Sequence, residues 1–332
     1  METTPFPPPM HAPPPVISVV APAYNEEEVI ALFCQEVGRA LEPLGFSYEI
    51  VIVENGSRDR TLDCLRALRA EDGRIHYVSL SRNFGHQGGL VAGLEQCRGE
   101  VVITMDADLQ HPPRLLPEMI RLWRQGFEVV NTFRREDSHI SRRRRWLNKV
   151  YYRTLSALSG LELSGGQTDF RLMSRLALNA LLQMPERGKY LRGLAAWIGF
   201  RQTGLSYDVP PRPAGHTKFN FMDLLRFGLD GIFSFSVLPL RIFSILGLII
   251  SAVSLGHVVW SFGLWIYREL SGHPLPPGWF SLASGIFFIG GVQLLGIGLL
   301  GEYVGRIYNE VRRRPVYLVR ENTLPPPGRP PS

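Results

Sequence analysis

The sequence has few cysteines, and their spacing predicts no disulfide bond between them. Cys34, Cys64 and Cys97 are the three cysteines among 332 residues, and they lie far apart. An odd number at this spacing excludes a disulfide framework and the usual zinc-binding patterns. We therefore expect free thiols in a protein that folds in a reducing compartment.

The N-terminus lacks the apolar run of a signal peptide. Residues 1–15 contain seven prolines, which predicts an extended, disordered arm. The last residues, LPPPGRPPS, predict a second such segment. No internal repeat lies between them, so the rest of the chain is expected to form one large domain or two smaller ones.

Charge is absent from two long stretches near the C-terminus. Ile242–Tyr267 and Trp279–Gly301 contain no Asp, Glu, Lys or Arg. As helices, both can cross the roughly 30 Å hydrocarbon core of a bilayer. We predict two transmembrane helices, about 240–267 and 279–303, within residues 237–304. A basic and proline-rich tail follows over residues 305–332.

The arginines beside the second stretch predict how the chain is oriented. Arg306 and Arg312–Arg314 follow it closely. Because basic residues stay on the cytoplasmic side, we expect an integral membrane protein with two spans, whose catalytic domain and both termini are cytoplasmic.

The segment over residues 216–236 is expected to contain a loop and a juxtamembrane helix. Asn220–Ser236 mixes apolar side chains with Asp223, Arg226 and Asp230. This pattern predicts an amphipathic helix in the membrane interface, with a core helix of the soluble domain as the alternative. Further upstream, Arg142–Arg145 predict a solvated helix face or a contact with anionic lipid headgroups.

Residues 16–215 are charged and show a different pattern. Short apolar runs alternate with amphipathic helical stretches, which predicts an α/β domain with a doubly wound, mostly parallel sheet. The expected strands are Val16–Ala21, Tyr48–Val53, Ile75–Leu80, Val101–Met105 and Phe127–Phe133.

Two carboxylates follow the fourth of these strands. Asp106 and Asp108 lie just beyond its carboxyl end, where open α/β sheets bind ligands. Carboxylates at this spacing can converge on Mg²⁺ or Mn²⁺, with substrate phosphates completing the coordination shell. The alternative is structural: Asp106 caps the next helix and Asp108 is solvated.

A nicotinamide-binding enzyme is the nearest competitor for this pattern of strands and helices. It requires Gly-x-Gly-x-x-Gly directly after an early strand. The first two strand-to-helix turns lack that motif. Its one occurrence, Gly296–Gly301, lies inside an uncharged stretch, where small residues serve helix packing. We therefore reject this class.

An ordered set of motifs resembles a known family. PAYNEEE, VENGSRDRT, LSRNFGHQGG, MDADLQHPP and TDFRLMSR occur in this order. The set resembles family 2 glycosyltransferases of the GT-A fold, and among them the polyprenyl-phosphate glycosyltransferases. The likeness extends from Val16 to about Pro315.

The resemblance implies a nucleotide-sugar site. It places Asp106 and Asp108 at the diphosphate and metal, with Ala107 and Gln110 beside them. Arg134, after the fifth strand, would lie near the phosphates or the sugar. The residues around the base and ribose would be Pro22, Tyr24, Glu26, Val53 and Asn55. The family usually has Asp-Asp-Gly-Ser where this chain has Glu54-Asn55-Gly56-Ser57, which leaves the base preference open.

The resemblance also implies an acceptor site. Asp169 would act as a base or orient the acceptor; an Asp169–Arg171 structural pair is the alternative. Arg212 and Lys218 match an Arg-x5-Lys loop suited to phosphate, and Arg192 is a further candidate. A lipid phosphate is already largely dianionic at neutral pH, so it needs little help from a base.

The function that the resemblance implies is an inverting, metal-dependent glycosyltransferase. It would move a sugar from a UDP- or GDP-sugar to an undecaprenyl or dolichyl phosphate at the cytoplasmic membrane face. The net charge of +6 fits such anionic partners; we expect no nucleic acid, and self-association is left open. One alternative is a processive polysaccharide synthase, which usually carries Gln-x-x-Arg-Trp, but Arg142 stands where that Gln would precede Arg145-Trp146. The other is a degenerate membrane-tethered binding protein.

Overall fold

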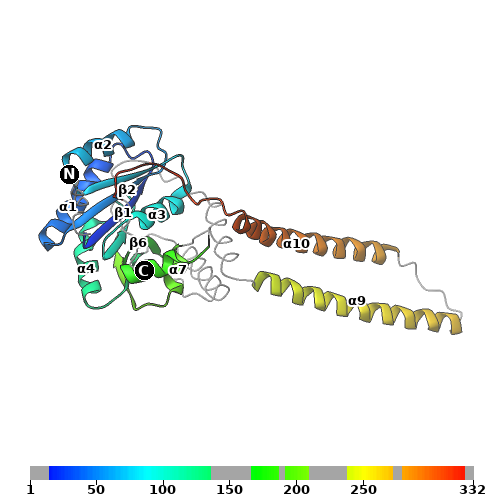
Figure 1. The fold of residues 1–332 in the computed structure, drawn as a ribbon. Coiled ribbons are helices and arrows are strands. Elements are labelled where there is room, and N and C mark those ends of the chain that lie inside the picture. The colour runs from blue at the N-terminus through cyan, green and yellow to red at the C-terminus, as the bar shows by residue number, and fades with distance from the viewer. Residues whose placement is uncertain (1–14, 136–165, 187–190, 209–237, 272–278, 326–332) are drawn as a thin grey trace, which may run out of the picture. The chain divides into compact units, whose positions relative to one another are not determined.

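A computed structural model describes residues 15–135, 166–186, 191–208, 238–271 and 279–325. The chain forms two units (Figure 1). The first contains the sheet domain together with the segment from Pro315 onward, and the second contains the two long C-terminal helices. Arg212, Lys218, the four consecutive arginines and the expected amphipathic helix all lie outside the described residues.

The first unit is built on an eight-stranded sheet with the order β7-β5-β6-β4-β1-β2-β3-β8. Four of its seven strand pairs are parallel, and the pairs β4–β6, β5–β6 and β3–β8 are antiparallel. The strands are β1 (Ile17–Ala23), β2 (Tyr48–Glu54), β3 (Ile75–Leu80), β4 (Val101–Thr104), β5 (Val129–Arg134), β6 (Gln167–Ser174), β7 (Gln202–Tyr207) and β8 (Val319–Asn322). The predicted α/β class and its mostly parallel sheet are confirmed.

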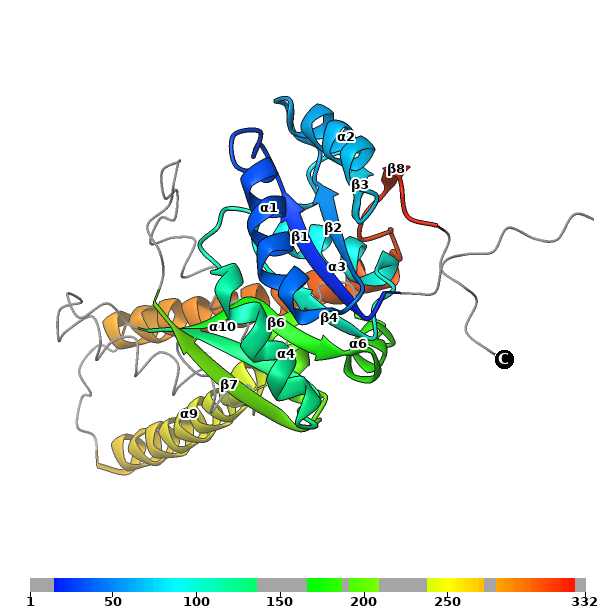
Figure 2. The ribbon, with the colours of Figure 1, turned by 90° about the vertical axis from the view of Figure 1, so that its left-hand side faces the viewer.

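Helices cover both faces of this sheet (Figure 2). Buried side chains of α1 (Ile30–Leu41), α2 (Thr61–Glu71) and α4 (Leu116–Arg124) join one core with alternate residues of the central strands. The other face is covered by α3 (Gly85–Gln96), which approaches so closely that a Cβ at Gly93 would lie 2.4 Å from Val20. Two short helices, α6 (Arg175–Leu182) and α7 (Leu191–Trp197), follow β6. Short 3-10 turns occur at Glu42–Leu44 and Pro113–Leu115.

Neither Asn25 nor Asp106 caps a helix. The first helix, α1, begins at Ile30 with Val29 as its N-cap. Asn25 instead adopts φ 56° and accepts a hydrogen bond from the Arg58 N–H at 2.8 Å. Asp106 does not cap α4 either, because the residue at that cap is Leu115. The helix-cap alternative for Asp106 is therefore wrong.

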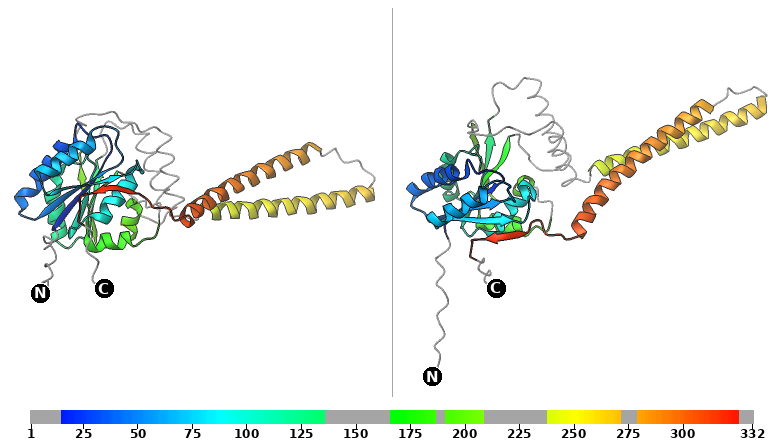
Figure 3. Two further views of the ribbon diagram at one scale, coloured as in Figure 1. Left: turned by 45° about the horizontal axis from the view of Figure 1, so that its top comes forward. Right: turned by 90° about the horizontal axis from the view of Figure 1, so that it is seen from above.

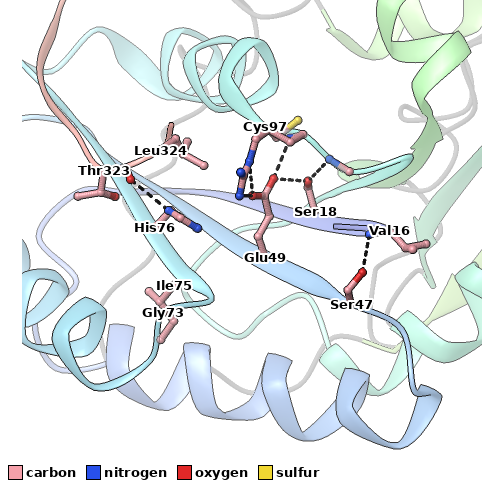
Figure 4. A network of polar contacts seen from close by, with 12 residues as sticks. Val16, Ser18, Ser47, Glu49, Gly73, Ile75, His76, Cys97, Thr323 and Leu324 are labelled. Carbon is pink, nitrogen blue, oxygen red and sulfur yellow. Dashed lines mark hydrogen bonds and ion pairs between the residues drawn. The ribbon is translucent and has the colours of Figure 1, made fainter. Parts of the chain in front are cut away.

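The chain returns to the sheet after its long helices. β8 forms the edge of the sheet and pairs with β3, which lies about 240 residues earlier in the sequence. The Thr323 hydroxyl accepts from the Tyr77 N–H at 2.9 Å, and Arg66 pairs with Glu321 at 2.8 Å. Thr323 also contacts His76 through its carbonyl oxygen (Figure 4). Part of the expected tail is therefore an edge strand.

A buried carboxylate at the amino end of the strands has a structural task. Glu49 is 1% exposed, accepts from the Ser18 hydroxyl at 2.6 Å and pairs with Arg98 at 2.7 Å (Figure 4). Its oxygens are occupied by the protein itself. We therefore look for chemistry at the opposite, carboxyl end of the sheet.

The second unit contains α9 (Leu238–Ser271) and α10 (Trp279–Val311), which lie side by side (Figure 3). Leu240–Leu264 and Phe288–Val311 are long and apolar enough to cross a membrane. A Cβ at Gly296 would lie 2.3 Å from the Phe243 ring. The first glycine of the rejected dinucleotide motif therefore serves helix packing.

Candidate active site

Asp106 and Asp108 lie in the turn that follows β4. Leu109 adopts φ 61°, and Asp108 Oδ1 accepts from the Gln110 N–H at 3.0 Å. The Asp106 N–H donates to Nδ1 of His111 at 2.8 Å. Hydrogen bonds from two nearby residues thus fix the conformation of the turn.

One oxygen of Asp106 is left without a partner. Its Oδ1 is buried and accepts no hydrogen bond from any described residue, although His86 Nε2 lies 3.5 Å away. A buried carboxylate oxygen without a donor is costly unless a ligand or ion fills the position. The Asp106–Asp108 turn therefore fits a divalent cation, although no group of three or more His, Cys, Asp or Glu suited to a metal occurs among the described residues.

Asp169 lies on β6, opposite this turn. Its side chain is 6% exposed, and Arg192 of α7 holds both its oxygens, Nε to Oδ1 at 2.9 Å and a terminal nitrogen to Oδ2 at 2.7 Å. Burial alone would raise the pKa of Asp169, but His86 and Arg192 hold that pKa far below its usual range. Asp169 is therefore an ionised, paired carboxylate.

His86, in the first turn of α3, links the two carboxylates. Its Nε2 lies 3.5 Å from Asp106 Oδ1 and 3.5 Å from Asp169 Oδ2. Burial opposes the charged ring, but contact with Asp169 and the charges of both carboxylates raise the pKa of His86. A histidine with a raised pKa thus lies between the carboxylates of Asp106 and Asp169.

Gln87 lies next to this contact. Its side-chain nitrogen donates to Asp169 at 3.4 Å, while its Oε1 is buried and has no partner among the described residues. The sequence analysis assigned no role to His86 or Gln87. Their position directly after a strand, inside LSRNFGHQGG, is the signal that could have identified them.

Both polar atoms of the Asn55 side chain form hydrogen bonds within the protein. Its Oδ1 accepts from the Phe84 N–H at 2.9 Å and its Nδ2 donates to the Gly85 carbonyl at 3.0 Å. Because an aspartate cannot donate, the amide explains why Asn is suited to this position. Asn55 thereby positions the start of α3, where His86 lies.

The other residues expected around the nucleotide differ in exposure. Tyr24 is 39% exposed and available to a ligand, whereas Val53 is fully buried. A Cβ at Gly93 would lie 2.8 Å from Val53, so this side chain packs against α3. Pro22 and Glu26 are half-buried, and the Glu26 N–H donates to Thr61 at 2.9 Å.

The remaining predicted residues lie near the Asp106 turn. Ala107 is buried at 2% exposure, and Gln110 and Arg134 are half-buried. Arg134 ends β5 and has a buried Nε that no described residue accepts. Five buried side-chain atoms lack partners among the described residues, and they belong to Gln87, Asp106, His111, Arg134 and Tyr207. Side-chain contacts or strand pairing connect each of these five residues to the carboxyl end of β4, where Asp106 lies.

His111 is a second residue that the sequence analysis missed. It is 1% exposed, stacks on Phe170 with centroids 5.2 Å apart and meets Tyr207 edge-on at 6.2 Å. Burial lowers the pKa of His111, so the ring is neutral. The position of His111 in the sequence, directly before Pro112-Pro113, did not predict its hydrogen bond with the Asp106 backbone.

Comparison with known proteins shows what the chain is similar to. The family model Glycosyl transferase family 2 matches residues 18–182, and the model GtrB C-terminal hairpin matches residues 238–307. An uncharacterized glycosyltransferase of Synechocystis is 41% identical over 305 residues, which cover 92% of this chain and 95% of the relative. A bactoprenol glucosyl transferase of Shigella phage SfII is 37% identical over 306 residues, covering 92% and 98%.

A solved structure with lower similarity was also found. It is glucosyl-3-phosphoglycerate synthase from Mycobacterium tuberculosis in complex with Mn²⁺ and UDP-glucose, 23% identical, with a TM-score of 0.42 over 66% of this chain and 77% of that one. The full-length relatives and the family match identify the chain, which belongs to glycosyltransferase family 2.

Proposed function

We propose that this chain is an inverting glycosyltransferase that moves a sugar from a nucleoside diphosphate sugar to a polyprenyl phosphate. The observation that carries the proposal is the buried Asp106 Oδ1, which accepts no hydrogen bond from a described residue and lies near Asp108 at the carboxyl end of β4. The 37% identity to a bactoprenol glucosyl transferase and the two apolar helices support a lipid acceptor.

Asp106 and Asp108 would hold Mg²⁺ or Mn²⁺ against the diphosphate. Both ions prefer carboxylate and phosphate oxygens, and the two carboxylates leave positions for the substrate. When bound, such an ion neutralises the charge that develops on the leaving diphosphate. Arg134, with a buried Nε that lacks a described partner, is suited to the same phosphates.

The reaction forms one bond and breaks another. A phosphate oxygen of the lipid attacks the anomeric carbon, and the bond from that carbon to the diphosphate oxygen breaks. The lipid phosphate has a second pKa near 6, so it is largely dianionic at neutral pH and needs no strong base. The main requirement is therefore to align two anions at close range.

Asp169 is poorly suited to accept a proton. Its pKa is held far below the usual range and both oxygens contact Arg192. Of its two predicted roles, we therefore favour positioning: Asp169 fixes Arg192 and His86 beside the Asp106 turn. Arg212 and Lys218 remain the candidates for holding the acceptor phosphate.

The membrane arrangement is part of the proposal. α9 and α10 would span the bilayer as a hairpin, with the catalytic unit and both termini on the cytoplasmic side. Placing a single cysteine at Ser271 or at Arg314, in a cysteine-free background, tests this with a membrane-impermeant thiol reagent. In intact cells, whose cytoplasm the reagent cannot enter, Ser271→Cys should be labelled and Arg314→Cys should not. The reverse pattern would refute the orientation.

The donor and acceptor are tested with one screen. Purified protein is incubated with polyprenyl phosphate of two chain types, Mg²⁺ or Mn²⁺, and a panel of UDP- and GDP-sugars, with detection by mass. The proposal predicts a product that carries one sugar. A polymer would indicate the processive synthase. If the protein neither transfers nor hydrolyses the sugar of any donor, it would be a binding protein.

A further inference from the structure

His111 contacts Asp106 through both of its ring nitrogens. The Asp106 N–H donates to Nδ1 at 2.8 Å, and Nε2 lies 3.6 Å from Asp106 Oδ2. Because Nδ1 accepts a hydrogen bond, the proton of the neutral ring is on Nε2. The N–H of Nε2 lies near Oδ2 without a hydrogen bond to any described residue. The other carboxylate oxygen, Oδ1, also accepts no hydrogen bond from the described residues, and His86 Nε2 lies 3.5 Å from it.

The ring has little freedom to move. It is 1% exposed and stacks on Phe170 with an interplanar angle of 17°, while Tyr207 meets it at 82°. Phe170 is the neighbour of Asp169 in β6. The same aromatic cluster therefore fixes the position of His111 relative to both carboxylates of the site.

Packing alone does not account for a histidine here. A phenylalanine would stack on Phe170 equally well, but it would leave the Asp106 N–H without its acceptor. Histidine supplies the acceptor for the Asp106 N–H at 2.8 Å, and its second nitrogen lies 3.6 Å from Oδ2. Groups that orient a metal-binding side chain in this way commonly change metal affinity by about 10-fold to 100-fold.

We propose that His111 is a positioning residue that fixes the backbone and carboxylate of Asp106 for a divalent cation and diphosphate. The inference rests on the proposed function. Its central element is the acceptor at Nδ1, and the donor at Nε2 is secondary because it lies 3.6 Å from Oδ2.

Two substitutions separate the ring nitrogens. In His111→Asn, the side-chain oxygen can take the place of Nδ1, whereas in His111→Gln the longer amide reaches the place of Nε2. His111→Phe keeps the stacking and removes both nitrogens. Mn²⁺ binding to the purified full-length protein is measured from the free-ion electron paramagnetic resonance signal, with UDP and separately with GDP.

The expected order of Mn²⁺ affinity is wild type, His111→Asn, His111→Gln and His111→Phe. We expect a loss of about 10-fold to 100-fold for His111→Phe and a smaller loss for His111→Asn than for His111→Gln. Affinity of His111→Phe equal to that of the wild type, or His111→Gln binding more tightly than His111→Asn, would overturn the proposal.

A second measurement needs no metal. Hydrogen exchange at the Asp106 amide should be slow in the wild type and in His111→Asn, and faster in His111→Gln. Equal exchange in all three would contradict the assigned hydrogen bond, and the comparison remains informative if His111→Phe does not fold. Asp108→Asn distinguishes the two proposals. If this variant binds Mn²⁺ as tightly as the wild type does, the proposed function fails. If Asp108→Asn loses Mn²⁺ affinity while the His111 variants keep wild-type affinity, only the positioning role is refuted.

Discussion

Arg192 holds the carboxylate of Asp169 through two contacts, at 2.9 Å and 2.7 Å. The two residues lie on different elements, α7 and β6, and the carboxylate is 6% exposed. The pair therefore joins the helix to the strand and leaves Asp169 charged inside the protein. Because Asp169 is charged and held by Arg192, it is suited to positioning neighbouring groups rather than to accepting a proton.

Replacing Arg192 should destabilise the fold. Arg192→Ala leaves a buried carboxylate without its main partner, and we expect the free energy of unfolding to fall by about 3 kcal/mol. Chemical denaturation measures this change. The double variant Arg192→Ala with Asp169→Asn should recover part of the loss; a double variant that is less stable by the sum of both single changes would contradict the coupling.

The contact of His86 with two carboxylates should make the stability of the metal-free protein depend on pH. The folded-state pKa of His86 is raised above an unfolded value of about 6.5. Its contribution to stability is therefore fully present below about pH 6.5 and is lost as the pH rises through the folded pKa. Thermal unfolding across this range should show a falling midpoint that is flatter in His86→Gln. Identical slopes in the two proteins would refute the assignment.

Two glycines with the same backbone angle offer a matched test of how the strand-end loops pack. Gly56 and Gly45 both have φ 70°, but a Cβ at Gly56 would lie 2.5 Å from the Arg82 backbone, whereas nothing lies within 4 Å at Gly45. Gly45→Ala should cost about 1–2 kcal/mol of unfolding free energy for the left-handed backbone alone. Gly56→Ala should cost more, because the loop that leads to α3 must move. Equal costs would show that the contact is unimportant.

The amide of Asn55 should be required at the start of α3. In Asn55→Asp a carboxylate would face the Gly85 carbonyl, to which the amide now donates at 3.0 Å. We expect a loss of about 1–3 kcal/mol in the free energy of unfolding. Asn55→Asp that is as stable as the wild type would show that the hydrogen bond is dispensable. A change in the preference between UDP- and GDP-sugars would instead indicate a contact with the base.

Local patterns predicted the central strands and their ligand-binding end. Ile75–Leu80 forms a strand with the expected bounds, because Ile75, Tyr77, Val78 and Leu80 favour a buried strand. β6 was missed as a strand because it contains Asp169 and Arg171, which are 5% and 2% exposed. Arg171 donates to the Leu191 and Thr168 carbonyl oxygens, and such partners cannot be read from neighbouring residues. β8 was missed for the same reason, since four residues pair with a distant strand.

The candidate site, like the fold, was predicted only in part from the sequence. Asp106 and Asp108 follow from their place after a strand, but the roles of His86 and His111 depend on contacts between elements. The suggested Asp169–Arg171 pair gives way to Asp169–Arg192 because α7 lies against β6, which no spacing in the sequence predicts. The place of Asn55 beside the nucleotide stays a prediction, and the sequence did not reveal that its amide joins two loops.

Transfer by Asp106→Asn and Asp108→Asn tests the central claim most directly. Each substitution keeps the shape of the side chain and removes the charge that would hold the cation. With the nucleotide sugar that the wild type uses best, the account predicts that formation of the lipid-linked sugar falls by at least about 100-fold, while thermal unfolding shows a folded protein. Transfer at the wild-type rate by either variant would contradict the account.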